Sequence, residues 1–416
     1  MPLTRLLYRA TVLREKYKYY EVYNTKSPMS KKTYKFRIFP SKEQIRIMND
    51  TLDLCRWTYN QTLAYRKNLW ETEKKNTSKY DSHYLLPIWK QEKPELKNVF
   101  SQVLQNVQER VDLAFQAFFR RVKAHENPGY PRFKGKGWYD SFTYPQGGFG
   151  LKNDKVEGSG HEVLWLSKIG EIKINLHRKI EGAIKRLTIN RSTRGKWYCS
   201  FVVEQTLEPQ VSQSDLVTGV DLGLTSFATF SDGSKIENPR FFRTEEKDLS
   251  KTQSKRDKLP KGSLERNKVT KVVQRIHERI ANKRLNFAHQ LSHDLVEKYG
   301  VLCFEDLNIK SMIQTASRGL SKSISDASWN ILVRLTQSKA ESAGSVVVLV
   351  DPKNTSQMCS RCGVIVPKDL SVRVHKCTCG LEMDRDQNAA LNILRLGLQS
   401  VGQTIGRRSP RLQSWE

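Results

Sequence analysis

The chain has 416 residues, and its 71 Lys and Arg outnumber its 43 Asp and Glu, which gives a formal net charge of +28. This excess indicates a polyanionic partner rather than a neutral one, because cationic side chains that neutralise phosphates release counterions. The length predicts two to four domains. No apolar run approaches the roughly 18 residues of a membrane-spanning helix, and the first residues lack the uninterrupted apolar core of a signal peptide.

The first third of the chain predicts a strand followed by long helices. Residues 1–29 show no clear period, so we expect a flexible extension, with Met1 or Met29 as the true start. A strand at 33–39 ends at Pro40, and Ser41 and Gln44 form a capping box that opens a helix. A second helix is expected at about 100–125, and residues 80–94 between the two helices are expected to be irregular. The polar face of the second helix, a candidate for DNA contacts, carries Gln105, Gln108, Arg110 and Arg121.

Residues 128–150 interleave cations, aromatic side chains and glycines, with Arg132 and Lys134 among the cations. Such a segment can stack on bases and bind phosphates, although a polar loop with a few core aromatics would have the same composition. Residues 160–205 alternate as short strands, with a hairpin around 192–195. Residues 207–214 are expected to form a linker.

From residue 216 the pattern changes to α/β. A strand at 217–223 is followed by 225–231 and an Asp-Gly turn, which predicts an antiparallel meander. Residues 244–299 are helical and very basic, strands follow at 301–305 and 345–350, and Ser325 and Asp326 are expected to cap the helix between them. This order predicts a mixed sheet of the RNase H type.

Three acidic residues stand at the edges of these elements. Asp221 and Glu305 lie at the ends of apolar strands, and Asp386 lies in or just before the first turn of an apolar-periodic helix. Brought together, three carboxylates repel one another unless they share cations, and hard oxygen ligands suit one or two Mg²⁺. Two metals about 4 Å apart are the arrangement that cuts phosphodiesters. Asp384 is close enough in sequence to support the site, but we do not expect it to be a ligand.

The seven cysteines are unevenly placed. Cys55, Cys199 and Cys303 stand alone in apolar contexts and are expected to be buried thiols in a reducing compartment. The other four form two turns that each end in Gly, and they fit a closed tetrahedral Zn²⁺ site better than a redox pair; they are Cys359, Cys362, Cys377 and Cys379. Because the second turn has the spacing C-x-C, His375 remains an alternative to one thiolate.

Several motifs follow one another in a distinctive order. They are Tyr-Lys-Phe-Arg-Ile-Phe-Pro at 34–40, Tyr-Pro-Arg-Phe-Lys at 130–134, Gly-Val-Asp-Leu-Gly at 219–223, Arg-Ile-His-Glu-Arg-Ile-Ala-Asn-Lys-Arg at 275–284, Phe-Glu-Asp-Leu-Asn-Ile at 304–309, Ser-Ile-Ser-Asp-Ala-Ser-Trp at 323–329, the two cysteine turns, and Asp-Arg-Asp-Gln-Asn-Ala-Ala-Leu-Asn-Ile at 384–393. In this order they resemble the transposon-encoded TnpB family, compact relatives of type V CRISPR effectors. The resemblance covers residues 32–396 and departs from the family at the C-x-C turn and the N-terminal extension.

The resemblance implies a multidomain α+β, RNA-guided DNA endonuclease. The domains would be a β-barrel wedge (30–43 and 128–214), a helical recognition domain (44–127), a RuvC-like nuclease domain (215–352 and 383–398), an inserted zinc ribbon (353–382) and a flexible tail (399–416). Asp221, Glu305 and Asp386 match the family's catalytic Mg²⁺ ligands, and the cysteines would hold a structural Zn²⁺.

The partners implied by the resemblance are a guide RNA from the transposon end and a double-stranded DNA target beside a short flanking motif. The family acts in the prokaryotic cytoplasm, and we expect a monomer with one RNA. Gln105 sits where similar proteins place a side chain near the flanking motif. Three alternatives remain open: a CRISPR-associated effector with an array-derived guide, a guided repressor without nuclease activity, and a strand-transferring transposase.

Overall fold

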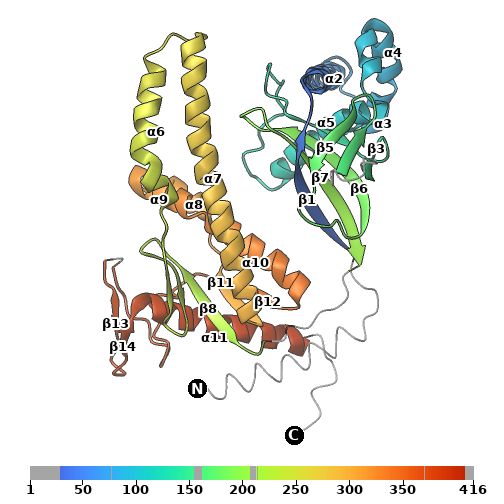
Figure 1. Ribbon diagram of the computed structural model, residues 1–416. Coiled ribbons are helices and arrows are strands. Elements are labelled where there is room, and N and C mark those ends of the chain that lie inside the picture. Colours follow the sequence, from blue (N-terminus) through green and yellow to red (C-terminus); the bar gives the residue numbers. More distant parts are fainter. Residues whose placement is uncertain are drawn as a thin grey trace. The chain divides into compact units, whose positions relative to one another are not determined.

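The computed structural model describes residues 29–75, 77–153, 162–206, 212, 214–369 and 371–407 (Figure 1). The chain divides into two compact units at residue 206, and each unit contains its own large sheet. Within the described residues no helix is both long and apolar enough to cross a membrane. The expected extension (1–29, apart from Met29) and the expected linker (207–214) lie almost wholly outside these residues.

The first unit is built on a seven-stranded antiparallel sheet. Its strand order is β2-β6-β7-β1-β5-β4-β3. The edge strands β2 and β3 follow each other in the chain with only residues 145–148 between them, so the sheet curls until its two edges are neighbours. The ring of Tyr144 on β2 contacts that of Phe149 on β3, with centroids 6.3 Å apart. The strands are β1 (Met29–Phe39), β2 (Ser141–Tyr144), β3 (Phe149–Asn153), β4 (Glu162–Leu166), β5 (Gly170–Asn175), β6 (Ala183–Arg191) and β7 (Trp197–Thr206).

Helices α2 (Lys42–Glu73) and α5 (Ser101–Lys123) pack in the same hydrophobic core as this sheet. The expected capping box is confirmed, because Ser41 accepts from the backbone of Gln44 and the Gln44 side chain accepts from the backbone of Ser41. The amide group of Gln44 also donates to the backbone of Glu171 at 2.7 Å, which ties the start of α2 to β5.

The expectation of irregular structure at 80–94 is wrong. The segment forms α3 (Lys79–His83) and α4 (Leu85–Glu92), followed by a 3₁₀ turn at Pro94–Asn98. Ser78 and Asp81 make a second capping box at the start of α3, a signal that the sequence contained. Mixed aromatic and polar residues hid the helical period, because these helices are short and bury only a few side chains.

The second unit is built on a mixed five-stranded sheet in the order β10-β9-β8-β11-β12. Strands β8, β11 and β12 are parallel to one another, while β9 and β10 are antiparallel to their neighbours. The expected mixed sheet and its opening meander are therefore confirmed. The strands are β8 (Val217–Leu222), β9 (Ser226–Phe230), β10 (Lys235–Glu237), β11 (Val301–Glu305) and β12 (Val346–Val350).

Helices cover the two faces of this sheet separately. Val220 and Leu302 share a core with α7 (Leu264–Lys298) and α10 (Trp329–Ala343) on one face. Cys303 belongs to a second core with α11 (Arg385–Arg407) on the other face. Because side chains alternate along a strand, the residues next to Val220 and Leu302 in the sequence point toward α11. Helix α11 runs to Arg407, past the boundary expected at 398.

Helices α6 (Phe241–Asp257) and α7 lie side by side as a long hairpin (Figure 1). Leu249 of α6 packs against Val273, Ile276 and Ile280 of α7. Basic residues fill the exposed sides of the hairpin, as expected from the sequence. Short helices α8 (Ile309–Thr315) and α9 (Arg318–Ala327) follow β11.

The expected cap at Ser325 and Asp326 is also wrong. Both residues lie inside α9, and α10 begins after Ser328, whose φ of 56° is left-handed. The buried carboxylate of Asp326 instead accepts hydrogen bonds from the backbone N–H of Phe242 and the guanidinium of Arg284, at 2.9 and 2.7 Å. It therefore fixes the base of the α6–α7 hairpin, a long-range contact that local pattern does not reveal.

Gly219 on β8 allows α11 to lie directly on the sheet. A Cβ at this position would lie 2.1 Å from the backbone oxygen of Ala390 and 2.6 Å from the backbone nitrogen of Leu394. We expect Gly219→Ala to lower the free energy of unfolding by about 1–3 kcal/mol, since the helix must move off the strand. Thermal unfolding of the full chain measures this as a lower Tm.

The control for that substitution is Gly319→Ala. Gly319 lies in α9 with nothing within 4 Å of the added methyl group. The gain in helix propensity should raise the free energy of unfolding by at most about 0.5–1 kcal/mol, so Tm should be equal or slightly higher. Equal Tm values for the two variants would contradict the close contact between α11 and β8.

Candidate metal centres and nucleic-acid contacts

The sheet register brings Asp221 and Glu305 next to each other. Strands β8 and β11 are parallel, and Phe304 is paired with Val220. The following residue on each strand is one of the two acids, so their side chains leave the sheet on the same face, on strands about 4.8 Å apart. That face is the one covered by α11, because Gly219 and Cys303 two residues earlier both contact this helix.

Helix α11 brings the third carboxylate to the same place. The helix crosses the sheet, with Gln387 against Gly233, Ala390 against Gly219 and Gly397 against Cys303. Asp386 lies one turn before Ala390 and therefore on the side of the helix that faces the sheet. Its negative charge and that of Glu305 both act on Asp221. The three acids that are far apart in the sequence are thus neighbours in the structure.

Burial and mutual repulsion disfavour negative charge in this cluster. The pKa of Asp221 lies well above its usual range, first because it is buried and then because of Glu305 and Asp386, while the Arg385 guanidinium partly offsets this. Burial also raises the pKa of Glu305, and the hydroxyl of Thr355 acts in the opposite direction. A divalent cation would relieve the repulsion, and carboxylate oxygens are the ligands that such cations prefer. The chemistry of this donor set, three carboxylates, therefore suits a divalent cation.

Asp384 has a different role from its neighbour Asp386. Burial alone would raise the pKa of Asp384, but the ammonium of Lys235 at 2.8 Å and the backbone N–H groups of Gln387 and Asp386 lower it overall. These two N–H groups lie 3.1 and 3.0 Å from Oδ1, so Asp384 caps the start of α11. Both of its oxygens are engaged by the protein, and a role for Asp384 in supporting the site stays a prediction.

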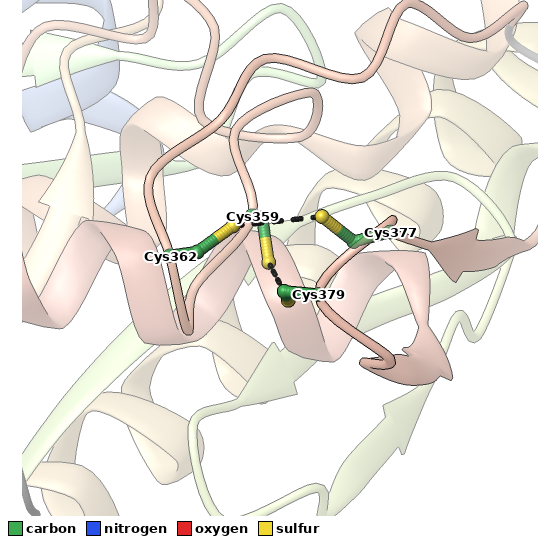
Figure 2. A group of neighbouring side chains, drawn as sticks. All are labelled: Cys359, Cys362, Cys377 and Cys379. Carbon is green, nitrogen blue, oxygen red and sulfur yellow. Dashed lines mark hydrogen bonds between the residues drawn. The ribbon is translucent and has the colours of Figure 1, made fainter.

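The four clustered cysteines form a second candidate metal centre (Figure 2). Their sulfur atoms all lie within 4.8 Å of one another. The sulfurs of Cys359 and Cys379 are 3.6 Å apart, and those of Cys362 and Cys377 are 3.5 Å apart. A tetrahedron of sulfurs about 2.3 Å from Zn²⁺ has edges of about 3.8 Å. The cluster therefore fits Zn²⁺ without rearrangement.

Local geometry supports the same assignment of ligands. The turns end at Gly363 and Gly380, whose φ values of 82° and 81° favour glycine. The backbone N–H of Cys379 and the neighbouring thiols lower the pKa of Cys377 to about 6, so a thiolate forms readily. His375 is buried outside the cluster and its ring contacts Lys368, so the structure selects the four thiols over the histidine.

The three remaining cysteines are buried thiols, as expected. Burial raises the pKa values of Cys55, Cys199 and Cys303 to about 12. At neutral pH they stay protonated and unreactive. Two of them lie in the core of the first unit, and Cys303 packs between β11 and α11.

Of the three residues expected to contact nucleic acid, one is exposed and two are half-buried. Arg132 is exposed, Gln105 is half-buried on α5, and Lys134 is half-buried. The backbone of Lys134 exchanges two hydrogen bonds with the side chain of Asn60, at 2.8 and 3.0 Å, and its ammonium lies over the ring of Tyr59. Lys134 therefore has a clear structural role in addition to any contact with a partner.

Two of the polar side chains expected on the exposed face of α5 instead contact neighbouring elements of the first unit. Gln108 is fully buried and donates to the backbone of Ser82 at 2.5 Å. Arg110 donates to the backbone of Ser141 and the hydroxyl of Thr143 on β2, at 2.9 and 2.7 Å. These side chains join α5 to neighbouring elements, so their assignment as a DNA-contacting face is wrong. A helix packed on two sides needs polar groups where it meets backbone edges.

Sequence reasoning missed several residues around the carboxylates. Thr355 donates to Glu305, and Arg385 binds Asp386. Asn388 and Asn392 are fully buried on α11 and bond to the chain around the first cysteine turn. The signal for the asparagines was present, because two Asn one turn apart on the apolar side of a helix require buried partners.

Comparison with known proteins assigns this chain to a family. Three family models match: a probable transposase over residues 200–316, a Cas12f1-like TNB domain over 329–393, and a helix-turn-helix domain over 29–75. In the last range the structure contains β1 and α2, a strand and one long helix. The Cas12f1-like match spans the cysteine cluster and Asp386.

Two bacterial relatives named "Putative RNA-guided DNA endonuclease" align over most of their length. The protein from Streptomyces pristinaespiralis is 33% identical over 92% of this chain and 94% of its own. InsQ of Escherichia coli K12 is 30% identical over 88% of this chain and 92% of its own. The cryo-EM structure of a Cas12f1–sgRNA–target DNA complex covers 88% of this chain and 98% of that one, with a TM-score of 0.54 and 14% identity, a likeness of fold. The chain belongs to the TnpB family of RNA-guided DNA endonucleases, relatives of the type V effectors.

Proposed function

We propose that this protein is an RNA-guided DNA endonuclease that cuts phosphodiesters with Mg²⁺ held by Asp221, Glu305 and Asp386. The observation that carries the proposal is the convergence of these half-buried carboxylates where α11 meets the sheet. Membership of the TnpB family supplies the substrate class. The net charge of +28 fits a protein that holds both a guide RNA and a DNA target.

The second unit has the features of an RNase H-like, RuvC-type nuclease domain. Its order of third, second, first, fourth and fifth strand, with three parallel strands, supports that assignment. We assign residues 215–352 and 383–398 to this domain and the cysteine segment (residues 353–382) to an inserted zinc ribbon. In the first unit we propose that the helices 44–127 form a recognition domain and the curled sheet (30–43 and 128–214) a wedge domain.

Division of labour explains how such a protein achieves specificity. Base pairing between a transposon-derived guide and the target strand selects the sequence, while the protein grips the heteroduplex by its backbone. We assign that grip to the basic sides of the α6–α7 hairpin and to residues 128–150. The first unit would read the short motif beside the target, with Gln105 on its surface.

The carboxylate cluster fits the needs of the cleavage step. Asp221, Glu305 and Asp386 would hold the Mg²⁺, which would supply an activated water and offset charge on the leaving 3′ oxygen, so that the products would carry 5′-phosphates. Asp221 and Glu305 are fixed by strand register, and Asp386 by the first turn of α11. Partial burial limits the access of bulk water to these oxygens, and the charge of Arg385 offsets part of the repulsion on Asp221. The cysteine cluster has four protein ligands and no open position, so we assign it a structural Zn²⁺.

Replacing one carboxylate should separate cutting from binding. Asp221→Asn preserves shape but removes a charge, and cleavage of target DNA with guide and Mg²⁺ should fall on the order of a thousandfold or more. Guide-RNA affinity, measured by filter binding, should stay within about twofold, since the buried acid touches no RNA. Glu341→Gln, at an exposed acid of α10, is the control and should cut normally. Loss of RNA binding by a folded Asp221→Asn chain would contradict the assignment.

Removing one thiol should release the zinc. Elemental analysis of the purified chain should find about one Zn²⁺ per molecule, and Cys377→Ser should reduce this to near zero because the tetrahedron loses a ligand. Cys199→Ala, in the core of the first unit, should retain the metal. A zinc content unaffected by Cys377→Ser would exclude the four-thiol site.

Arg132 should contact a phosphate rather than a base. Arg132→Ala should weaken guide-RNA or target-DNA binding evenly across sequences and reduce the slope of log affinity against log salt by about 1. Arg121→Ala is the comparison, because the Arg121 guanidinium is engaged by the backbone of Pro128 and its loss should affect stability first. An unchanged salt slope in Arg132→Ala would remove residue 132 from the interface.

A further inference from the structure

The cysteine segment begins beside Glu305. The hydroxyl of Thr355 donates to Oε1 of Glu305 at 2.5 Å, and Thr355 is 2% exposed. The Thr355 hydroxyl also lies 3.1 Å from the carbonyl of Pro352. One hydroxyl proton serves one acceptor at a time, and a charged acceptor makes the stronger bond. Thr355 therefore fixes the orientation of the Glu305 carboxylate.

The chain returns from the cysteine segment beside Asp386. Arg385 donates through Nε and Nη2 to Oδ1 of Asp386, at 3.1 and 3.0 Å. Its Nη1 donates to the carbonyl of Val372 at 3.1 Å, and its backbone N–H donates to Arg373 at 2.8 Å. One side chain thus holds a carboxylate of the cluster and the cysteine segment together.

Two buried amides fasten the first cysteine turn to α11. Asn392 donates to the carbonyls of Thr355 and Met358, at 2.9 and 2.6 Å. Asn388 donates to Met358 at 2.8 Å and accepts from the backbone of Ser360 at 2.9 Å. Met358 and Ser360 flank the first cysteine. The position of Thr355 is therefore fixed by the same helix that carries Asp386.

We propose that the cysteine segment positions two of the three metal-binding carboxylates, through Thr355 near its start and through its contacts with Arg385, which follows its end. Thr355 is the positioning residue for Glu305, and Arg385 is the positioning residue for Asp386. The inference rests on the proposed function for the identity of the ligands, and it adds that the nuclease site binds its cation tightly only while these contacts hold. Partners that orient metal ligands in this way typically change metal affinity by about 10–100-fold.

A purely structural role makes a different prediction. A hydroxyl bonded to a buried carboxylate also stabilises the fold, and its loss would then lower Tm without changing the affinity of the folded chain for a cation. The positioning role changes the affinity itself, and the response should depend on the hydroxyl rather than on side-chain shape. Thr355→Val removes the hydroxyl and keeps the shape, while Thr355→Ser keeps the hydroxyl.

The experiment titrates Mg²⁺ alone into the full chain by calorimetry and measures target cleavage by the guide-loaded chain as a function of Mg²⁺. Thr355→Val should bind Mg²⁺ about tenfold more weakly, and its half-maximal Mg²⁺ concentration should rise while cleavage at saturating Mg²⁺ largely recovers. Thr355→Ser should resemble wild type. Thr336→Val is the matched control, because among the described residues that buried hydroxyl bonds to Leu332 of its own helix alone.

Two results would overturn the inference: a Thr355→Val chain with wild-type Mg²⁺ affinity, or a Thr355→Ser chain as weak as Thr355→Val. Arg385→Lys tests the other end independently of Thr355 and guards against misfolding of the valine variant. It keeps the charge and loses the paired bonds to Asp386, and an unchanged Mg²⁺ requirement would also count against the proposal. A wild-type chain that binds Mg²⁺ and guide but leaves DNA intact would instead refute the proposed function.

Discussion

Repulsion within a cluster of three half-buried carboxylates is the constraint on which the second unit depends. Burial and then the charges of Glu305 and Asp386 raise the pKa of Asp221, and burial raises the pKa of Glu305. A cluster of this kind lowers the stability of the chain unless other contacts hold the elements in place. Parallel register between β8 and β11, the contact of α11 with Gly219, and the buried asparagines of α11 supply those contacts.

The two metal centres solve the problem of anionic ligands in different ways. At the cysteine cluster four thiols surround a closed position, and the described part of the segment that carries them consists mainly of turns. A metal ion bound there would do the work of a hydrophobic core. At the carboxylate cluster the fold exists around the site, and the charges are held in place by a sheet and a helix. On the proposed function, the first centre would contribute to folding, while the second would cost stability and be retained for its chemistry.

Sequence reasoning succeeded where a signal was local. The strands that end at Asp221 and Glu305, the capping box at Ser41 and the paired cysteine turns each have their own short pattern. It failed where a side chain binds a residue that is distant in the sequence. Asp326 looked like a helix cap and instead binds Arg284 and the backbone of Phe242, and the polar face of α5 looked like a DNA surface and instead joins that helix to β2. Thr355 was missed for the same reason, since nothing near it in the chain points to Glu305.

Chain connectivity explains why the cysteine segment can reach the carboxylates at both ends. Strand β12 is paired with β11 so that Val350 lies opposite Glu305, which means that the chain leaves the sheet at the level of this acid. It re-enters at Arg385, where α11 must begin for Asp386 to face Asp221. Any segment inserted between these points has its two ends beside the site, whatever it carries in between. A segment closed by a metal ion would be rigid in that position, because its metal ligands would fix the distance between its two ends without contacts from the sheet. The topology thus makes the insertion a natural support for the acids that flank it.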